Sequence, residues 1–201
     1  MNLEKYQQYS RIARGLEKAD LVLKNARIVN VFTEEIIRGD IAIQDGIIAG
    51  IGSFHGKEER DLAGRYVCPG FIDSHLHLES TLVTPAELVT AASRHGTTTF
   101  IVDPHESANV SGLAGIDYIL DQTEDVKANV YVMMPSCVPA TAIDDNGCTL
   151  TAEDMVPYLH NSRILGLGEV MDSISVVQGE KSMHDKLELF EGRIRDGHAP
   201  F

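Results

Sequence analysis

From Tyr66 to the end of the sequence, short apolar runs alternate with amphipathic segments. Four of the apolar runs have the length and composition of buried strands: YVCPGFIDSH (66–75), TTTFIVD (97–103), NVYVMMPS (129–136) and RILGLGEVM (163–171). Strands that alternate with helices form βα units around a parallel sheet. The sequence therefore predicts an α/β fold for this part of the chain.

Helices are expected between these strands. In TPAELVTAASRHG (84–96), Thr84 is placed to cap the helix, Pro85 suits its first turn, Glu87 completes a capping box and Gly96 ends it. Further helices are expected over 111–124, 151–161 and 181–195, the last with Met183, Leu187, Phe190 and Ile194 on one face. A fifth strand is expected after residue 195, so the chain holds about four complete βα units.

The first 65 residues follow a different pattern. Residues 1–19 are expected to be helical, and residues 20–65 contain short β-rich runs with Asp45-Gly46 at a hairpin turn. We therefore expect two domains. Residues 1–65 form an N-terminal helix with a small antiparallel, β-sandwich-like sheet, and residues 66–201 carry the βα units.

Composition excludes several functional classes. The 17 Lys and Arg residues against 30 Asp and Glu residues give a net charge of −13, which argues against a nucleic-acid partner. No apolar run approaches the roughly 18 residues of a membrane span, and MNLEKYQQYSR is too charged for a signal peptide, so we expect a cytoplasmic protein with no membrane contact. Cys68, Cys137 and Cys148 are too irregularly spaced for a disulfide framework or a CxxC zinc site.

The strand over 66–75 leads into a His-x-His pair, His75 and His77. Side chains two residues apart on a strand point to the same side, so the two imidazoles converge on one point. Histidine nitrogens are common ligands of divalent metals. A bare pair of this kind is usually one core and one surface histidine, but its place at the end of a strand that opens a βα series favours a metal site.

Two later strand ends add ionisable groups at the same edge of the sheet. Asp103, His105 and Glu106 follow the strand over 97–103, and Glu169 lies among apolar residues in the strand over 163–171. A carboxylate is costly to bury unless it is paired or bound to a metal. The alternatives are a polar loop for the first group and a solvated strand end for Glu169. His198 is expected at the start of the fifth strand, facing the same edge.

Five segments, in their order and spacing, resemble the adenine deaminase family of the amidohydrolase superfamily: GFIDSHLHLES (70–80), DPHE (103–106), SCVPA (136–140), LGLGEVMD (165–172) and DGHAP (196–200). The resemblance extends over the whole chain. It implies a (β/α)8 TIM-type barrel with an accessory sheet domain, of which this chain would hold about four to five βα units. It also implies hydrolysis of adenine to hypoxanthine and ammonia, a reaction of purine salvage.

The resemblance implies a divalent metal pair that activates water for attack on C6 of the purine. Mn²⁺ is the expected metal, and Fe²⁺ and Zn²⁺ are the alternatives. His75 and His77 correspond to the first ligand pair, Glu169 to the carboxylate that bridges the two metals, and His198 to a further ligand. Together with Glu169, the catalytic candidates are Asp103, His105 and Glu106, in supporting or substrate-facing roles. Glu79 and Ser80 are weaker candidates, since a first loop turn explains them equally well.

The resemblance further implies a strand-six histidine and a strand-eight aspartate, and neither lies within these 201 residues. We therefore expect a truncated chain that is inactive alone unless a complementing C-terminal half or a homo-oligomer completes the site. Two other interpretations stay open: an amidohydrolase that acts on cyclic amides, and a non-catalytic fragment. Glu169 in place of a lysine and the DPHE segment count against the first of these.

Overall fold

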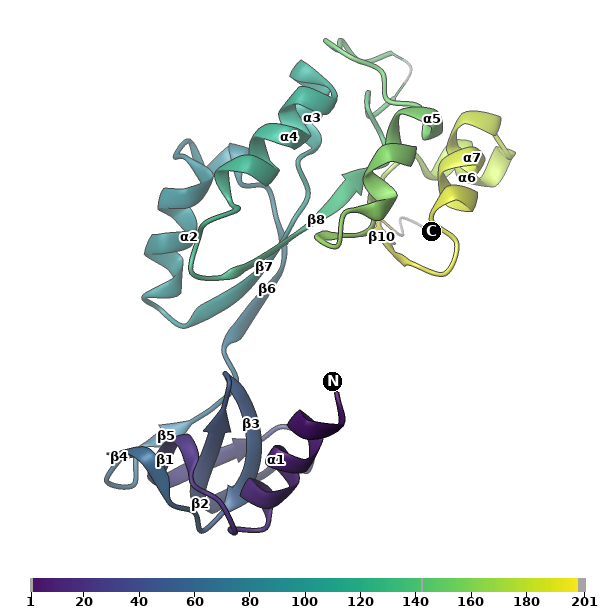
Figure 1. Ribbon diagram of the computed structural model, residues 1–201. Helices are drawn as coiled ribbons and strands as arrows, with labels where there is room; N and C mark the ends of the chain where they lie inside the picture. The colour runs from purple at the N-terminus through teal and green to yellow at the C-terminus, as the bar shows by residue number, and fades with distance from the viewer. Residues whose placement is uncertain (1, 142, 199–201) are drawn as a thin grey trace. The chain divides into compact units, whose positions relative to one another are not determined.

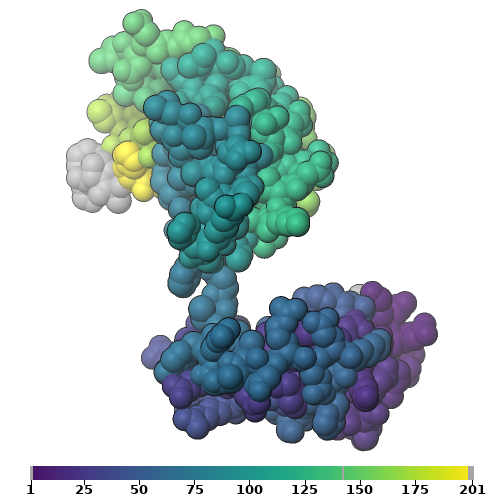
Figure 2. Space-filling model, turned by 90° about the vertical axis from the view of Figure 1, so that its left-hand side faces the viewer, coloured from purple at the N-terminus to yellow at the C-terminus, as the bar shows by residue number. Residues whose placement is uncertain are grey.

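A computed structural model describes residues 2–141 and 143–198. The chain divides into two compact units, Met1–Pro69 and Gly70–Phe201 (Figure 2). The division lies later than residue 65 because Tyr66 and Val67 pair with the sheet of the first unit. The strand expected over 66–75 is therefore split, since Pro69 has no N–H to donate to a strand ladder.

The first unit is a helix followed by a mixed sheet. It contains α1 (Leu3–Ala13), β1 (Ala19–Asn30), β2 (Glu35–Gln44), β3 (Ile47–Gly52), β4 (Gly56–Asp61) and β5 (Tyr66–Val67). The sheet order is β3-β2-β1-β4, and β5 also pairs with β1. Asp45 (φ 51°) and Gly46 (φ 74°) join β2 to β3, as the hairpin prediction requires.

Two expectations for this unit are wrong. The helix ends at Ala13 rather than near residue 19, because Gly15 takes a left-handed φ of 71° that a helix cannot continue. The sheet is not wholly antiparallel, since β4 and β5 both run parallel to β1. The sequence of β4, GKEERD, is almost entirely charged and exposed, which is typical of an edge strand that is protected from pairing with another chain. It lacks the alternation of apolar and polar residues that indicates a half-buried strand.

The second unit is a five-stranded parallel sheet with helices between its strands (Figure 1). Its strands are β6 (Phe71–Leu76), β7 (Thr97–Val102), β8 (Asn129–Pro135), β9 (Ile164–Val170) and β10 (Ile194–Gly197). They lie in the order β10-β9-β8-β7-β6, so each strand pairs with its neighbour in the chain. The predicted α/β fold with a parallel sheet is confirmed. A sequential order without reversal is typical of barrels rather than doubly wound sheets.

The helices of this unit are α2 (Pro85–Ser93), α3 (His105–Ser111), α4 (Leu113–Gln122), α5 (Ala152–Met155), α6 (Ser173–Gln178) and α7 (Lys181–Leu189), with short 3-10 helices η1 (Glu79–Thr81) and η2 (Val156–His160). Figure 1 shows α2 beside α4 and α5 beside α7. The core between helices and sheet is apolar, with Phe100, Ile116, Met134, Leu167 and Phe190 at its centre.

Several helix boundaries differ from the prediction. The last helix ends at Leu189 rather than Arg195, because Gly192 has a φ of 77° and Ile194 already belongs to β10. Thr84 makes no side-chain capping bond, so the capping box predicted there does not form.

Two further helices differ in kind. The helix expected over 111–124 follows a separate helix, α3, from which Gly112 divides it at a φ of 62°. The helix expected over 151–161 is a single α-turn continued by a 3-10 helix. Across the described parts of the chain, no helix has the length and apolar character needed to cross a membrane.

Candidate metal centre

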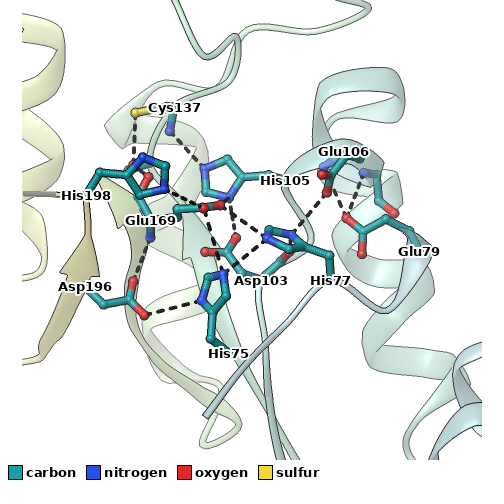
Figure 3. Close-up of polar contacts among 12 residues, drawn as sticks. His75, His77, Glu79, Asp103, His105, Glu106, Cys137, Glu169, Asp196 and His198 are labelled. Carbon is teal, nitrogen blue, oxygen red and sulfur yellow. Dashed lines mark hydrogen bonds and ion pairs between the residues drawn. The ribbon is translucent and has the colours of Figure 1, made fainter. Parts of the chain in front are cut away.

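Every site residue predicted from the sequence lies at or just beyond the carboxyl ends of the parallel strands (Figure 3). His75 lies in β6 and His77 follows that strand. Asp103, His105 and Glu106 follow β7, with His105 and Glu106 in the first turn of α3. Glu169 lies near the end of β9. His198 directly follows β10 rather than starting a strand, because that strand begins earlier, at Ile194.

Glu169 is the centre of the cluster. One carboxylate oxygen, Oε1, lies 3.0 Å from Nε2 of His198 and 3.8 Å from Nε2 of His75. The other, Oε2, lies 3.4 Å from Nε2 of His77 and 3.5 Å from Nδ1 of His105. Only 14% of the Glu169 side chain is exposed. Its two oxygens therefore face two different pairs of imidazoles, and all four rings converge on this one carboxylate.

The ring of His77 is held in one orientation. Its Nδ1 lies 2.7 Å from the carbonyl oxygen of Asp103 and 3.2 Å from a carboxylate oxygen of Glu106. Both neighbours accept hydrogen bonds, so Nδ1 carries a proton and donates it. The lone pair of Nε2 is then free on the side that faces His75 and Glu169, which is the arrangement of a metal-binding histidine held by an outer partner.

The spacing of the donor atoms also fits a divalent metal. Nε2 of His75 and Nε2 of His77 are 3.2 Å apart. Two nitrogens bound to one tetrahedral metal at about 2.0–2.1 Å would be roughly 3.3 Å apart. Ligating atoms of His75, His77 and Glu169 all lie within 4.8 Å of one another, and a second such group consists of Asp103, His105 and Glu169. The donor set, imidazole nitrogens with carboxylate oxygens, is one that Mn²⁺, Fe²⁺ and Zn²⁺ accept.

The electrostatic field of the site is negative. Burial lowers the pKa of His77, but the charges of Glu106, Glu169 and Asp103 outweigh this effect, and the net pKa is raised above its usual value. Burial also raises the pKa of Asp103, although the hydrogen bond from His105 opposes the change. Asp103 is fully buried, and its Oδ2 has no hydrogen-bond partner among the described residues. A cation in this site would relieve the repulsion between its carboxylates.

His105 is occupied at both ring nitrogens. Its Nδ1 donates a hydrogen bond to Asp103, and its Nε2 accepts one from the backbone N–H of Cys137 at 3.4 Å. The side chain is only 6% exposed. These contacts favour a supporting role for His105, since both of its ring nitrogens are engaged with protein groups.

Glu79 and Glu106 form the outer part of the cluster. Oε1 of Glu79 accepts hydrogen bonds from the backbone N–H groups of Glu106 and Ser107 at 3.1 and 3.3 Å, so it caps α3. Burial and the nearby carboxylate of Glu106 raise the pKa of Glu79 to about 7. Both glutamates and Ser80 line a pocket of about 570 Å³.

Two residues at the site were not singled out from the sequence. Asp196 accepts a hydrogen bond from the backbone N–H of Glu169, and Ser136 donates one to the carbonyl oxygen of Glu169. Asp196 could have been found from its spacing, because it lies in β10 two residues before His198, which follows that strand. Ser136 carried no such signal, since a serine at a strand end is also typical of a turn.

The sequence profile of the amidohydrolase family matches residues 66–191, which is more than half of the chain. The chain belongs to the amidohydrolase family.

Its relatives include several adenine deaminases. That of Desulfitobacterium hafniense (strain Y51) is 58% identical over 201 residues, a match that covers all of this chain and 35% of that protein. Adenine deaminase 2 of Carboxydothermus hydrogenoformans is 50% identical over 189 residues, covering 94% of this chain and 33% of that protein. The chain therefore spans about a third of the length of these curated relatives. The resemblance to the adenine deaminase family is confirmed.

Among solved structures, the chain is similar to an N-acyl-D-glutamate deacylase from Bordetella bronchiseptica, complexed with zinc and a phosphonate inhibitor, with a TM-score of 0.47 and 19% identity. That match covers 77% of this chain and 39% of the deacylase.

Proposed function

We propose that this chain forms the N-terminal part of an adenine deaminase, a metal-dependent hydrolase that converts adenine and water to hypoxanthine and ammonia. The observation that carries the proposal is the carboxylate of Glu169, whose two oxygens face separate pairs of imidazoles at the ends of parallel strands. Identity of 58% to an adenine deaminase over the whole chain supports adenine as the substrate.

The sheet supports a TIM-type barrel as the complete fold. Five parallel strands follow one another in sequential order, as in the first part of an eight-stranded barrel. Barrel enzymes place their chemistry at the carboxyl ends of these strands, where the histidines and carboxylates of this chain lie. A complementing C-terminal half or a homo-oligomer would supply the remaining strands. We expect the chain alone to be inactive, and we expect the enzyme to be cytoplasmic.

His75, His77, Glu169 and His198 would hold the metal pair, Mn²⁺ by preference and otherwise Fe²⁺ or Zn²⁺. A bound divalent metal pair supplies Lewis-acid activation of water near neutral pH. The residues of this chain prepare the site for it. The carbonyl of Asp103 fixes the His77 ring, and the carboxylate of Glu169 spans the two pairs of imidazoles.

The remaining candidates divide into one residue that can contact the purine and two that support the site. In the reaction, the water oxygen bonds to C6, the bond from C6 to the exocyclic nitrogen breaks, and protons pass to the departing ammonia. Glu106 is half exposed and can accept a hydrogen bond from an N–H of the purine. Asp103 and His105 are buried and paired with each other, so they hold the frame of the site rather than contact the substrate.

The test joins this chain to the remaining portion of the Desulfitobacterium hafniense relative and supplies the protein with Mn²⁺. We expect equal amounts of hypoxanthine and ammonia from adenine, and no turnover of dihydrouracil, a cyclic amide. The chain without the added portion serves as the control and should release no ammonia. Hydrolysis of dihydrouracil with adenine left untouched would show that the enzyme acts on cyclic amides instead.

A further inference from the structure

We propose that Asp196 and Ser136 are positioning residues that hold the backbone of Glu169 on both sides of its Cα and so fix the direction of its carboxylate. The inference rests on the proposed metal site and adds two residues to it. Among the described residues, neither Asp196 nor Ser136 is a member of a group of candidate metal ligands.

The backbone of Glu169 needs such support. Its φ is +39°, in the left-handed region that side chains other than glycine rarely adopt. Such a conformation is energetically unfavourable and persists only where the surroundings of the residue determine it. Glu169 is the next-to-last residue of β9, so this unusual φ lies where the strand ends and the carboxylate must be directed.

Asp196 holds the amide side of Glu169. Its Oδ1 accepts a hydrogen bond from the Glu169 N–H at 2.7 Å, a short distance typical of a charged acceptor. Its other oxygen, Oδ2, lies 3.9 Å from Nδ1 of His75, which is too far for a hydrogen bond. Nδ1 is the ring nitrogen that does not face His77 and Glu169, so Asp196 approaches His75 from behind. Figure 3 shows dashed lines from Asp196 to the Glu169 N–H and to His75. One carboxylate thus lies behind two of the proposed ligands, the place of an outer partner in a metal site.

Ser136 holds the carbonyl side of Glu169. Its Oγ donates to the Glu169 carbonyl oxygen at 2.9 Å, and its own N–H donates to the carbonyl of Gly168 at 3.1 Å. Its carbonyl accepts a hydrogen bond from Nζ of Lys186 at 2.7 Å. Ser136 is fully buried, and Lys186 is 6% exposed. Because all three polar groups of Ser136 are engaged, its hydroxyl is itself held in place.

The two residues therefore act on one peptide segment from opposite directions. Loss of either hydrogen bond would let Glu169 relax toward ordinary strand geometry, and its carboxylate would turn away from the imidazoles. Outer partners of this kind typically contribute 10- to 100-fold to metal affinity. Asparagine at position 196 keeps an oxygen that can accept the same bond, whereas alanine does not.

The test measures binding of Mn²⁺ by titration calorimetry to this chain joined to the remaining portion of the Desulfitobacterium hafniense relative, because the proposed site needs residues from that portion. We expect Asp196→Ala and Ser136→Ala each to weaken Mn²⁺ binding about tenfold or more, and Asp196→Asn to remain within about threefold of wild type. Matched controls are Asp185→Ala, which removes a surface ion pair with Lys181, and Ser93→Ala, which removes a serine bond to a helix carbonyl. Both controls should bind Mn²⁺ as the wild type does.

A second measurement does not depend on the metal. In the metal-free chain, amide hydrogen exchange of Glu169, followed by NMR, should be faster in Asp196→Ala and close to wild type in Asp196→Asn. Thermal unfolding of each variant identifies the temperature range in which it is folded, and both measurements are made within that range.

The outcomes separate this inference from the proposed function. A wild-type joined protein that binds no Mn²⁺ contradicts the metal site and, with it, the role given to Asp196 and Ser136. A wild-type joined protein that binds Mn²⁺ while Asp196→Ala and Ser136→Ala bind equally well overturns the positioning role alone. Equal loss in Asp196→Ala and Asp196→Asn also overturns it, because the hydrogen bond would then not be the cause.

Discussion

Replacing Gly168 by alanine tests how closely the candidate site is packed. A Cβ at this position would lie 2.2 Å from Oδ2 of Asp103 and 2.7 Å from Cβ of Met133. Real Cβ contacts of less than 3.0 Å essentially do not occur, so one of these groups must move. Neither can move freely, because Asp103 is 0% and Met133 1% exposed, and Asp103 is also bonded to His105.

The expected cost follows from these contacts. Overpacking of a tight core typically costs about 1–3 kcal/mol, and the loss of glycine freedom in the unfolded chain returns about 0.4–1 kcal/mol. We therefore expect Gly168→Ala to lower the free energy of unfolding by about 1–2 kcal/mol, which corresponds to a fall in the midpoint temperature of roughly 2–8 °C. Because the carbonyl of Asp103 orients His77, displacement of Asp103 should also weaken Mn²⁺ binding.

Thermal unfolding followed by circular dichroism and Mn²⁺ titration measure the two effects. Gly52→Ala is the matched control, since the nearest atom to its added Cβ would lie at 3.4 Å, an ordinary contact. That variant should unfold within about 0.5 kcal/mol of wild type. If Gly168→Ala unfolded at the wild-type midpoint and bound Mn²⁺ with wild-type affinity, the close contact between β9 and Asp103 would be wrong.

Two further predictions concern stability away from the site. Asp40 accepts hydrogen bonds from Nζ of Lys24 (2.5 Å) and from the backbone N–H groups of Asn25 (3.0 Å) and Phe54 (3.2 Å). Because these donors would lose their partner, Asp40→Ala should lower the free energy of unfolding, measured in urea, by about 3 kcal/mol. Burial raises the pKa of Asp40, but these hydrogen bonds outweigh burial and the net pKa is lowered. The difference in free energy of unfolding between wild type and Asp40→Ala should therefore be full above pH 3.8 and shrink as the pH falls below that value. A difference that is unchanged at pH 2 would contradict this assignment. Thr151 forms a capping box with Asp154, whereas Thr84 makes no side-chain capping bond. Thr151→Ala should therefore lower the free energy of unfolding by about 1 kcal/mol, and Thr84→Ala by less than about 0.5 kcal/mol. Equal losses would show that the two caps do not differ.

The fold was predictable where the hydrophobic period was strong. The strands over 97–103, 129–136 and 163–171 were found because each is a continuous apolar run, as buried parallel strands are. The end of the last helix was not found, since Ile194 continues the helical spacing of Met183 and Phe190 although it lies in β10. Apolar spacing alone cannot show that the chain has turned at Gly192.

The site was predictable to the extent that its residues follow strand ends. His75, His77, Glu169 and His198 come together because carboxyl ends of parallel strands meet at one edge of a sheet. The contacts of Ser136 and Asp196 with Glu169 could not be predicted in the same way. They depend on the left-handed backbone of Glu169, which no residue type in LGLGEVM signals.

Glu169→Gln in the protein joined to the remaining portion of its relative tests the metal centre and the reaction together. The substitution keeps the size of the side chain but removes its charge and one of its carboxylate oxygens. Bound Mn²⁺, measured by mass spectrometry, and ammonia released from adenine should both be lost, while the unsubstituted protein shows both. Full Mn²⁺ content with an undiminished rate of ammonia release would contradict the assignment of Glu169 as the carboxylate that holds the metals.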